Sequence, residues 1–155
     1  MKPIHLVTLI LVAVAVMLGI TMMKKKQEQS APKVAASSGP PAGATFVDVE
    51  KAPLDVIMSG NMYVGQWIKE PGWQVAIKEI TKSSDGGKAL RIEVSQPSTL
   101  RGSAWIVAVV PEDTDIKVNQ FVMLSGRIDE IREFNDGGPI PGRTLVVRDA
   151  KLTRL

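Results

Sequence analysis

The chain has 155 residues, with 19 Lys and Arg, 16 Asp and Glu, one histidine and no cysteine. This length allows one folded domain of ordinary size, and the lack of cysteine excludes disulfides, thiolate metal sites, lipoprotein acylation and covalent c-type haem. The formal charge of +3 is unevenly distributed, since residues 1–44 carry five lysines and one glutamate while residues 45–155 carry 14 basic and 15 acidic residues. The near-neutral domain counts against nucleic acid as its partner.

Residues 4–23 (IHLVTLILVAVAVMLGITMM) predict a membrane-spanning helix. They contain no Asp, Glu, Lys or Arg, and a helix of this length spans roughly 30 Å, the thickness of the hydrocarbon core of a bilayer. A cleavable signal peptide is the alternative, but three lysines follow the run directly, without a small-x-small cleavage site. We therefore expect residues 1–26 to be an uncleaved anchor with a basic flank. Its membrane-contacting residues would include Leu6, Leu9, Val16, Gly19, Lys24, Lys25 and Lys26.

Residues 27–44 (QEQSAPKVAASSGPPAGA) are expected to be a flexible linker, because Ser, Ala, Pro and Gly without periodic apolar positions cannot bury a core. The lysines that follow the anchor would keep the domain in the cytoplasm by the positive-inside tendency, with a margin of one charge. Long domains translocate largely regardless of charge, however, and this layout is common among bacterial envelope proteins. We expect a single-pass membrane protein, with the extracytoplasmic (periplasmic) side preferred for the domain.

Residues 45–155 have the texture of a β domain, with short runs rich in Val, Ile and aromatic residues between turn signals. The predicted strands are residues 74–81, 89–95, 104–110, 121–131 and 143–152. Residues 84–87 (SDGG) predict a hairpin turn between the first two strands, because Gly tolerates positive φ. The second predicted strand alternates Leu90 and Ile92 with Arg91, as expected for a half-solvated strand, while the third is apolar on both faces.

The fourth predicted strand carries the signal for a bend. Gly126 lies in its middle, where a bulge or sharp coil would need it, and Ile131 breaks the alternation that runs through Leu124 and Ile128. A long, kinked strand bends a sheet toward closure. The sequence therefore predicts a mostly-β domain that forms a small closed barrel, with a compact β-sandwich as the alternative.

Residues 122–128 (VMLSGRI), then Arg132, a loop with Gly137 and Gly138, and residues 145–150 (LVVRDA) resemble paired strands of OB-fold domains. The layout of anchor, linker and small barrel is also similar to that of the haem chaperone used in cytochrome c maturation. That family carries haem on a histidine near its C-terminus, whereas the only histidine here is His5. The resemblance therefore does not imply haem binding, and no cofactor is expected.

Tyr63, Trp67 and Trp73 gather around an expected turn at residues 69–72, where exposed aromatic rings could stack on a sugar or a base. The alternative is that they plug one end of the barrel. Several arginines could form a phosphate-reading face, although the acidic residues interleaved among them favour a salt-bridged, solvated surface. These arginines are Arg91, Arg101, Arg127, Arg132, Arg143 and Arg148.

No catalytic or metal-binding constellation is evident from the sequence. Residues 112–115 (EDTD) lack the spaced ligands, the central Gly and the closing Glu of a calcium loop, so we expect a polar turn and no metal. The domain has no histidine or cysteine, which leaves carboxylate, Lys, Tyr or Ser chemistry. Asp129, Glu130 and Glu133 are close in sequence, but nothing in the pattern pairs them in a cleft.

Three functional hypotheses follow. The first is a non-enzymatic binding or assembly module that docks its barrel on a protein partner or a larger complex at the membrane. The second is an OB-type module for single-stranded nucleic acid or an oligosaccharide, with its ligand-binding residues at Tyr63, Trp67, Trp73, Arg127 and Arg132. The third is a hydrolase or transferase that uses carboxylates, and it requires two acids that converge in a pocket.

Overall fold

The computed structural model describes residues 39–95 and 102–155. The predicted anchor and residues 27–38 of the predicted linker lie outside this part of the chain. Among the described residues, no helix has the length and apolar character needed to cross a membrane.

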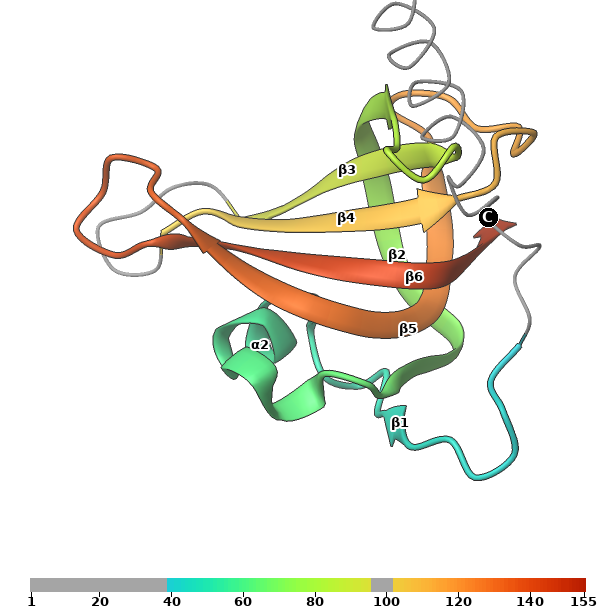
Figure 1. Cartoon of the computed structure of the whole chain (residues 1–155), viewed down its shortest axis with the longest axis horizontal. Coiled ribbons are helices and arrows are strands. Elements are labelled where there is room, and N and C mark those ends of the chain that lie inside the picture. The colour runs from blue at the N-terminus through green and yellow to red at the C-terminus, as the bar shows by residue number, and fades with distance from the viewer. Residues whose placement is uncertain (1–38, 96–101) are drawn as a thin grey trace, which may run out of the picture. The chain divides into compact units, whose positions relative to one another are not determined.

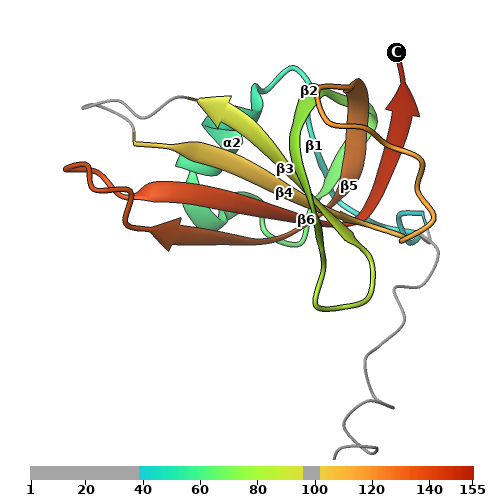
Figure 2. The same ribbon diagram turned by 90° about the horizontal axis from the view of Figure 1, so that it is seen from above.

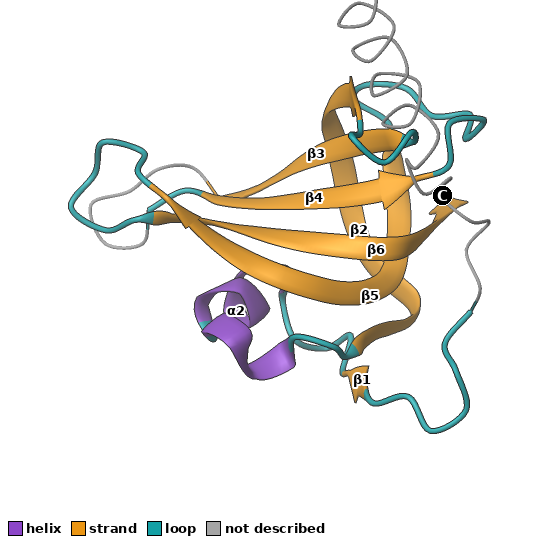
Figure 3. Ribbon diagram, in the orientation of Figure 1, coloured by secondary structure: helices purple, strands orange, loops and turns teal. Residues whose placement is uncertain are grey.

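Strands make up most of the described chain (Figure 3). The elements are β1 (Phe46–Val47), α2 (Pro53–Met58), the 3-10 helix η1 (Gly60–Tyr63), β2 (Trp67–Lys82), β3 (Lys88–Ser95), β4 (Ala104–Val110), β5 (Phe121–Phe134) and β6 (Gly142–Arg154).

Five strands close into a barrel with mixed pairing. β3 pairs antiparallel with β2 and with β4, β4 pairs parallel with β6, and β6 pairs antiparallel with β5. β5 also pairs antiparallel with β2, which closes the ring. Figure 1 shows β3, β4, β6 and β5 side by side in this order, with β2 passing behind them. The predicted mostly-β class is confirmed, and the closed barrel is the correct one of the two predicted architectures.

The five predicted strands are the five barrel strands, each with ends that differ by a few residues at most, except for the start of β2. In β3, Leu90 and Ile92 are buried while Arg91 is exposed, as the alternation predicts. The predicted hairpin is confirmed between β2 and β3. There the Ser83 N–H donates to the Gly87 carbonyl at 2.8 Å and Gly86 has a φ of 86°.

The predicted bend in β5 is also confirmed. Its pairing with β6 shifts register at Gly126 and again after Ile128, and the second shift explains why Ile131 leaves the alternation. Gly126 has a φ of 151°, and a Cβ at this position would lie 2.6 Å from Val147 Cγ1. The glycine thus lets β5 approach the paired strand β6 closely at this bulge, which helps the sheet to curl.

The turn predicted at residues 69–72 is wrong, because these residues lie inside β2. The peptide bond before Pro71 is cis, and the pairing of β2 with β5 is interrupted across this stretch. Gly72 has a φ of 95°, and a side chain there would overlap the Leu124 carbonyl. Pro and Gly therefore mark an irregularity within a strand rather than its end, as they do at bulges.

The helix α2 plugs one end of the barrel and has no counterpart among the predicted elements. It starts at Pro53, a favoured first helical residue, and buries Val56 and Ile57 completely in the core. The Arg143 guanidinium of β6 donates to the Met58 carbonyl at 2.8 Å, which ties the helix end to the barrel. Figure 2, turned by 90°, shows the helix behind β3 and β4. Six residues are too few for a helical period to be recognised in the sequence.

Candidate functional site

The three aromatic residues predicted to bind a ligand do not form one exposed platform. Trp73 is 3% exposed and belongs to the core, where its Nε1–H donates to the Lys51 carbonyl at 3.1 Å. Tyr63 packs against the core, and its hydroxyl accepts a hydrogen bond from the Lys51 ammonium group. Trp67 is 7% exposed and lines a surface groove. The structure therefore separates these residues, and their predicted ligand-binding role stays a prediction.

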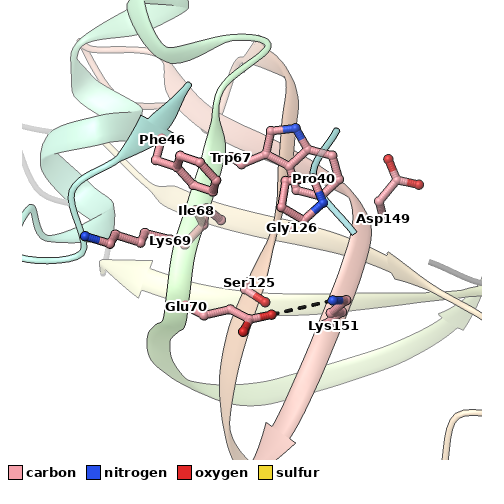
Figure 4. A pocket seen from close by; sticks show the side chains of 10 residues that line it. All are labelled: Pro40, Phe46, Trp67, Ile68, Lys69, Glu70, Ser125, Gly126, Asp149 and Lys151. Carbon is pink, nitrogen blue, oxygen red and sulfur yellow. Dashed lines mark ion pairs between the residues drawn. The ribbon is translucent and has the colours of Figure 1, made fainter. Parts of the chain in front are cut away.

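We call this surface hollow the Trp67 groove. It has a volume of about 390 Å³ and lies over β1, the start of β2, and the middle of β5 and β6 (Figure 4). Gly126 of β5, the register partner of Ile68 in β2, also lines the groove. Its lining residues are, for the apolar part, Pro40, Phe46, Trp67 and Ile68, and, for the polar part, Lys69, Glu70, Ser125, Asp149 and Lys151.

The charges at the rim of the Trp67 groove are mostly paired. Lys151 lies 3.5 Å from Glu70, an ion pair that bridges β6 and β2 (Figure 4). Asp149 lies 3.7 Å from the predicted site residue Arg127. Lys69 has no ion-pair partner among the residues that the structure describes. The groove thus combines an apolar wall with one unpaired cation.

A second surface covers the outside of β3, β4, β6 and β5. Residues opposite one another in neighbouring strands point to the same side of a sheet. The register places Glu93, Trp105, Thr144 and Arg132 in one row and Arg91, Val107, Val146 and Glu130 in the next. We call these eight residues the Trp105 face. Their neighbours along the strands, such as Ile92, Ile106 and Leu145, are buried in the core.

Trp105 has the most distinctive surroundings on this face. The Arg91 guanidinium lies 3.9 Å from the centre of the Trp105 ring and 3.6 Å from the Glu79 carboxylate. Arg132 forms an ion pair with Glu130 and lowers the pKa of that carboxyl below its ordinary value, mainly by donating a hydrogen bond. The face therefore has an apolar centre between charges of both signs.

Trp105 was not singled out by the sequence analysis. It belongs to a strand that is apolar on both faces, so alternation does not show which residues point outward. The one available signal is its phase, because Trp105 and Val107 alternate with the small or aliphatic residues Ala104, Ile106 and Ala108. Closure of the barrel is what places Trp105 outside the core, next to β6.

The arginine-rich surface is salt-bridged, as the interleaved acids predicted. Arg148 contacts both Asp85 and Asp129, and Arg127 lies 2.9 Å from Asp129. Glu133 pairs with Arg143 at 2.8 Å. The carboxylates Asp129, Glu130 and Glu133, considered above for catalysis, thus each face an arginine. Arg101 lies outside the described residues.

Two loop carboxyls have lowered pKa values. Asp85, in the β2–β3 turn, accepts a hydrogen bond from Arg148, which is the main reason that its pKa lies below the ordinary value. Asp136, in the β5–β6 loop, accepts the backbone N–H of Ser103 at 2.9 Å, and this hydrogen bond is the main cause of its lowered pKa. Both carboxylates hold a loop against another part of the barrel.

These lowered pKa values predict that the domain loses stability in acid. A carboxyl whose pKa is lower in the folded than in the unfolded state stabilises the fold fully at neutral pH, and this contribution is lost as the pH falls below about 4. We expect urea unfolding, followed by tryptophan fluorescence, to give a smaller free energy of unfolding at about pH 3 than at pH 7. Asp136→Asn should reduce this difference. A domain that is equally stable at both pH values would contradict the prediction.

Residues 112–115 form a turn region in which the Thr114 N–H donates to the Pro111 carbonyl at 3.2 Å and Asp115 pairs with Arg154. Across residues 39–95 and 102–155, no cluster of three or more His, Cys, Asp or Glu is arranged to hold a metal ion.

Comparison with protein-family models, curated proteins and solved structures finds no match to this chain.

Proposed function

We propose that the chain is a membrane-anchored binding module without catalytic activity, which docks a partner protein on the Trp105 face of an OB-like barrel. The five-stranded closed barrel supports the OB-like part, as does the finding that residues 122–150, which resemble paired OB strands, lie largely in the paired strands β5 and β6. OB folds bind their ligands on the face of their second and third strands. Counted from β2, the first strand of this barrel, the second and third strands are β3 and β4. They carry Arg91 and Trp105.

The observation that carries the proposal is the composition of the Trp105 face. Trp105 and Val107, both partly exposed, form its apolar centre beside Val146, which is only 6% exposed, with Arg91 and Arg132 on either side. Tryptophan and arginine are the residue types most often found at the energetic centres of protein interfaces, which are apolar and surrounded by a polar rim. A partner with an apolar centre and charges of both signs would complement this face.

Nucleic acid is the less favoured occupant of the same face. The Arg91 guanidinium covers one face of the Trp105 ring at 3.9 Å, so a base could stack on that face only by displacing it. The arginines of the face also lie beside carboxylates, Glu79 for Arg91 and Glu130 for Arg132. These carboxylates offset the positive potential that a polyanion requires.

The predicted anchor completes the proposal. It would hold the barrel at the cell membrane and raise its effective concentration near a membrane-bound partner, without any new contact. We therefore propose that the partner belongs to a complex at the same membrane, with the periplasmic side preferred for the barrel.

Site-specific photo-crosslinking of the full-length chain in its native membrane tests the proposal. A photoreactive amino acid replaces Thr144 on the Trp105 face or, as a control, the exposed Glu112 in the β4–β5 loop. We expect one defined protein product from position 144 and not from position 112. Adding Trp105→Ala should lower the yield of that product at least about tenfold, because loss of a hot-spot residue costs about 2 kcal/mol or more.

Several outcomes would overturn the proposal. One is the absence of a position-144 product, and another is a product that persists unchanged in the Trp105→Ala variant. A product that nuclease or glycosidase removes would assign the face to nucleic acid or oligosaccharide instead. Circular dichroism of the Trp105→Ala variant shows whether the barrel is still folded.

A further inference from the structure

The chain enters the described part of the domain at the rim of the Trp67 groove. A side chain added at Gly39 would lie 3.5 Å from the Lys151 ammonium group, and Pro40 lines the groove itself. The following residues turn, with the Ala44 N–H donating to the Pro41 carbonyl at 3.1 Å, and then lead into β1 beside Trp67. The side of the barrel that receives the linker is therefore also the side that carries the groove.

The predicted anchor and its basic flank end at Lys26, and residues 27–38 separate them from Gly39. A chain of this length spans at most about 40 Å when fully extended. An unstructured chain of the same length averages about 20 Å between its ends. If the predicted anchor spans a bilayer, a tether of this length lets the groove side of the barrel reach the bilayer surface.

The chemistry of the Trp67 groove suits a lipid surface. Phe46 is 48% exposed at the rim, beside Trp67 and Pro40. Aromatic side chains favour the interface between water and hydrocarbon, where an apolar body can be buried at the level of the headgroups. Lys69, without an ion-pair partner in the described part of the chain, supplies a cation for lipid phosphates. The ion pairs of Lys151 with Glu70 and of Arg127 with Asp149 offset the other charges at the rim, so Lys69 leaves a net positive charge there.

We infer that the Trp67 groove docks on a bilayer surface that contains anionic lipids, with Phe46 at the level of the headgroups and Lys69 at the lipid phosphates. The inference rests on the anchor that is part of the proposed function. It uses a different set of residues from the Trp105 face, however, so a barrel docked in this way still presents that face to a partner.

Fluorescence quenching on the full-length chain in lipid nanodiscs tests this inference. The chain has no cysteine, so Thr45→Cys, an exposed and uncharged position next to Phe46, and Asp113→Cys in the β4–β5 loop each place one environment-sensitive label. Nanodiscs with phosphatidylglycerol and a headgroup nitroxide lipid should quench the label at position 45 more strongly than the label at position 113. Discs of phosphatidylcholine alone should reduce the difference, because they do not attract Lys69.

Two substitutions test whether docking depends on Phe46 and on Lys69. Phe46→Ala should lower the ratio of docked to undocked barrel at least about tenfold, since it removes the aromatic ring from the interface. Lys69→Ala should lower this ratio about fivefold in anionic discs, which is the contribution of one lysine near an anionic surface. Lys117→Ala, in the β4–β5 loop, removes an exposed lysine away from the groove and should have no effect.

The possible outcomes distinguish a failure of groove docking from a failure of the anchor prediction. A chain that does not enter the nanodiscs shows that the anchor prediction is wrong, and the inference fails with it. A chain that enters, but whose two labels are quenched equally, overturns the inference while the anchor stands. The photo-crosslink from position 144 is measured independently, so it decides the partner-docking proposal in either case.

Discussion

Replacement of Trp73 by alanine is expected to lower the free energy of unfolding by about 3–5 kcal/mol, the usual cost of removing a large aromatic side chain from a core. Trp73 is 3% exposed, and its Nε1–H is bonded to the Lys51 carbonyl, which precedes α2. The variant would leave a cavity, and it would leave the Lys51 carbonyl unsatisfied where the segment before α2 meets the barrel. Urea unfolding monitored by far-ultraviolet circular dichroism measures the loss.

Trp73→Phe is the matched control for this prediction. It keeps most of the aromatic volume but removes the indole N–H, so it should cost less, about 1–3 kcal/mol. A Trp73→Ala variant with an unchanged unfolding midpoint would contradict the core assignment. An unchanged midpoint together with a changed binding partner would instead support the ligand-binding role that the sequence predicts for Trp73.

Gly126→Ala is expected to destabilise the barrel by about 2–5 kcal/mol, from overpacking and from backbone strain. The added Cβ would lie 2.6 Å from Val147 Cγ1 and 2.9 Å from the Arg148 carbonyl oxygen, and the φ of 151° is one that residues with a side chain rarely adopt. Relief of this overlap requires the paired strands β5 and β6 to separate near Gly126. Thermal and urea unfolding of the purified variant measure the effect.

Gly137→Ala separates the two causes of this loss. Gly137 also has a positive φ, of 83°, but an added Cβ there meets no atom within 4 Å. It should therefore show the cost of strain without the cost of overlap, and be clearly more stable than Gly126→Ala. Equal losses in the two variants would mean that the close approach of β5 to β6 at Gly126 contributes nothing to the loss.

The Gly126 result also bears on the Trp67 groove. Gly126 lines the groove together with Asp149 and Lys151 of β6, and a Cβ at Gly126 would press on β6 at Val147, Arg148 and Ala150. A side chain at position 126 would therefore be expected to disturb the groove as well as the fold. For this reason the docking experiment uses Phe46 and Lys69, which lie at the rim.

The strands and their bends could be predicted because the signals that specify them are local. Alternation of Leu90 and Ile92 with Arg91 reflects one buried and one solvated face, and glycines at the β2–β3 turn reflect a positive φ. The same type of local reasoning failed at Pro71 and Gly72. These residue types usually end a strand, but here they occupy an irregularity that the pairing of β2 with β5 tolerates.

The candidate sites could be predicted only in part. The sequence pointed to Trp67, which does line a groove, but it also pointed to Trp73, which lies in the core. Both tryptophans flank the same Pro-Gly pair, and nothing in their spacing distinguishes the inward from the outward ring. Trp105 was missed for the related reason that its strand is apolar on both faces.

The sequence by itself determined the mostly-β class, the five barrel strands, the bend at Gly126 and the contrast between a basic N-terminal segment and a near-neutral domain. These depend on composition and on neighbours along the chain. Only the tertiary structure decided the parallel pairing of β4 with β6, the plug formed by α2, and the positions of Trp73 inside and Trp105 outside. Such features depend on contacts between residues distant in sequence, whose free energy is gained only when the whole barrel closes.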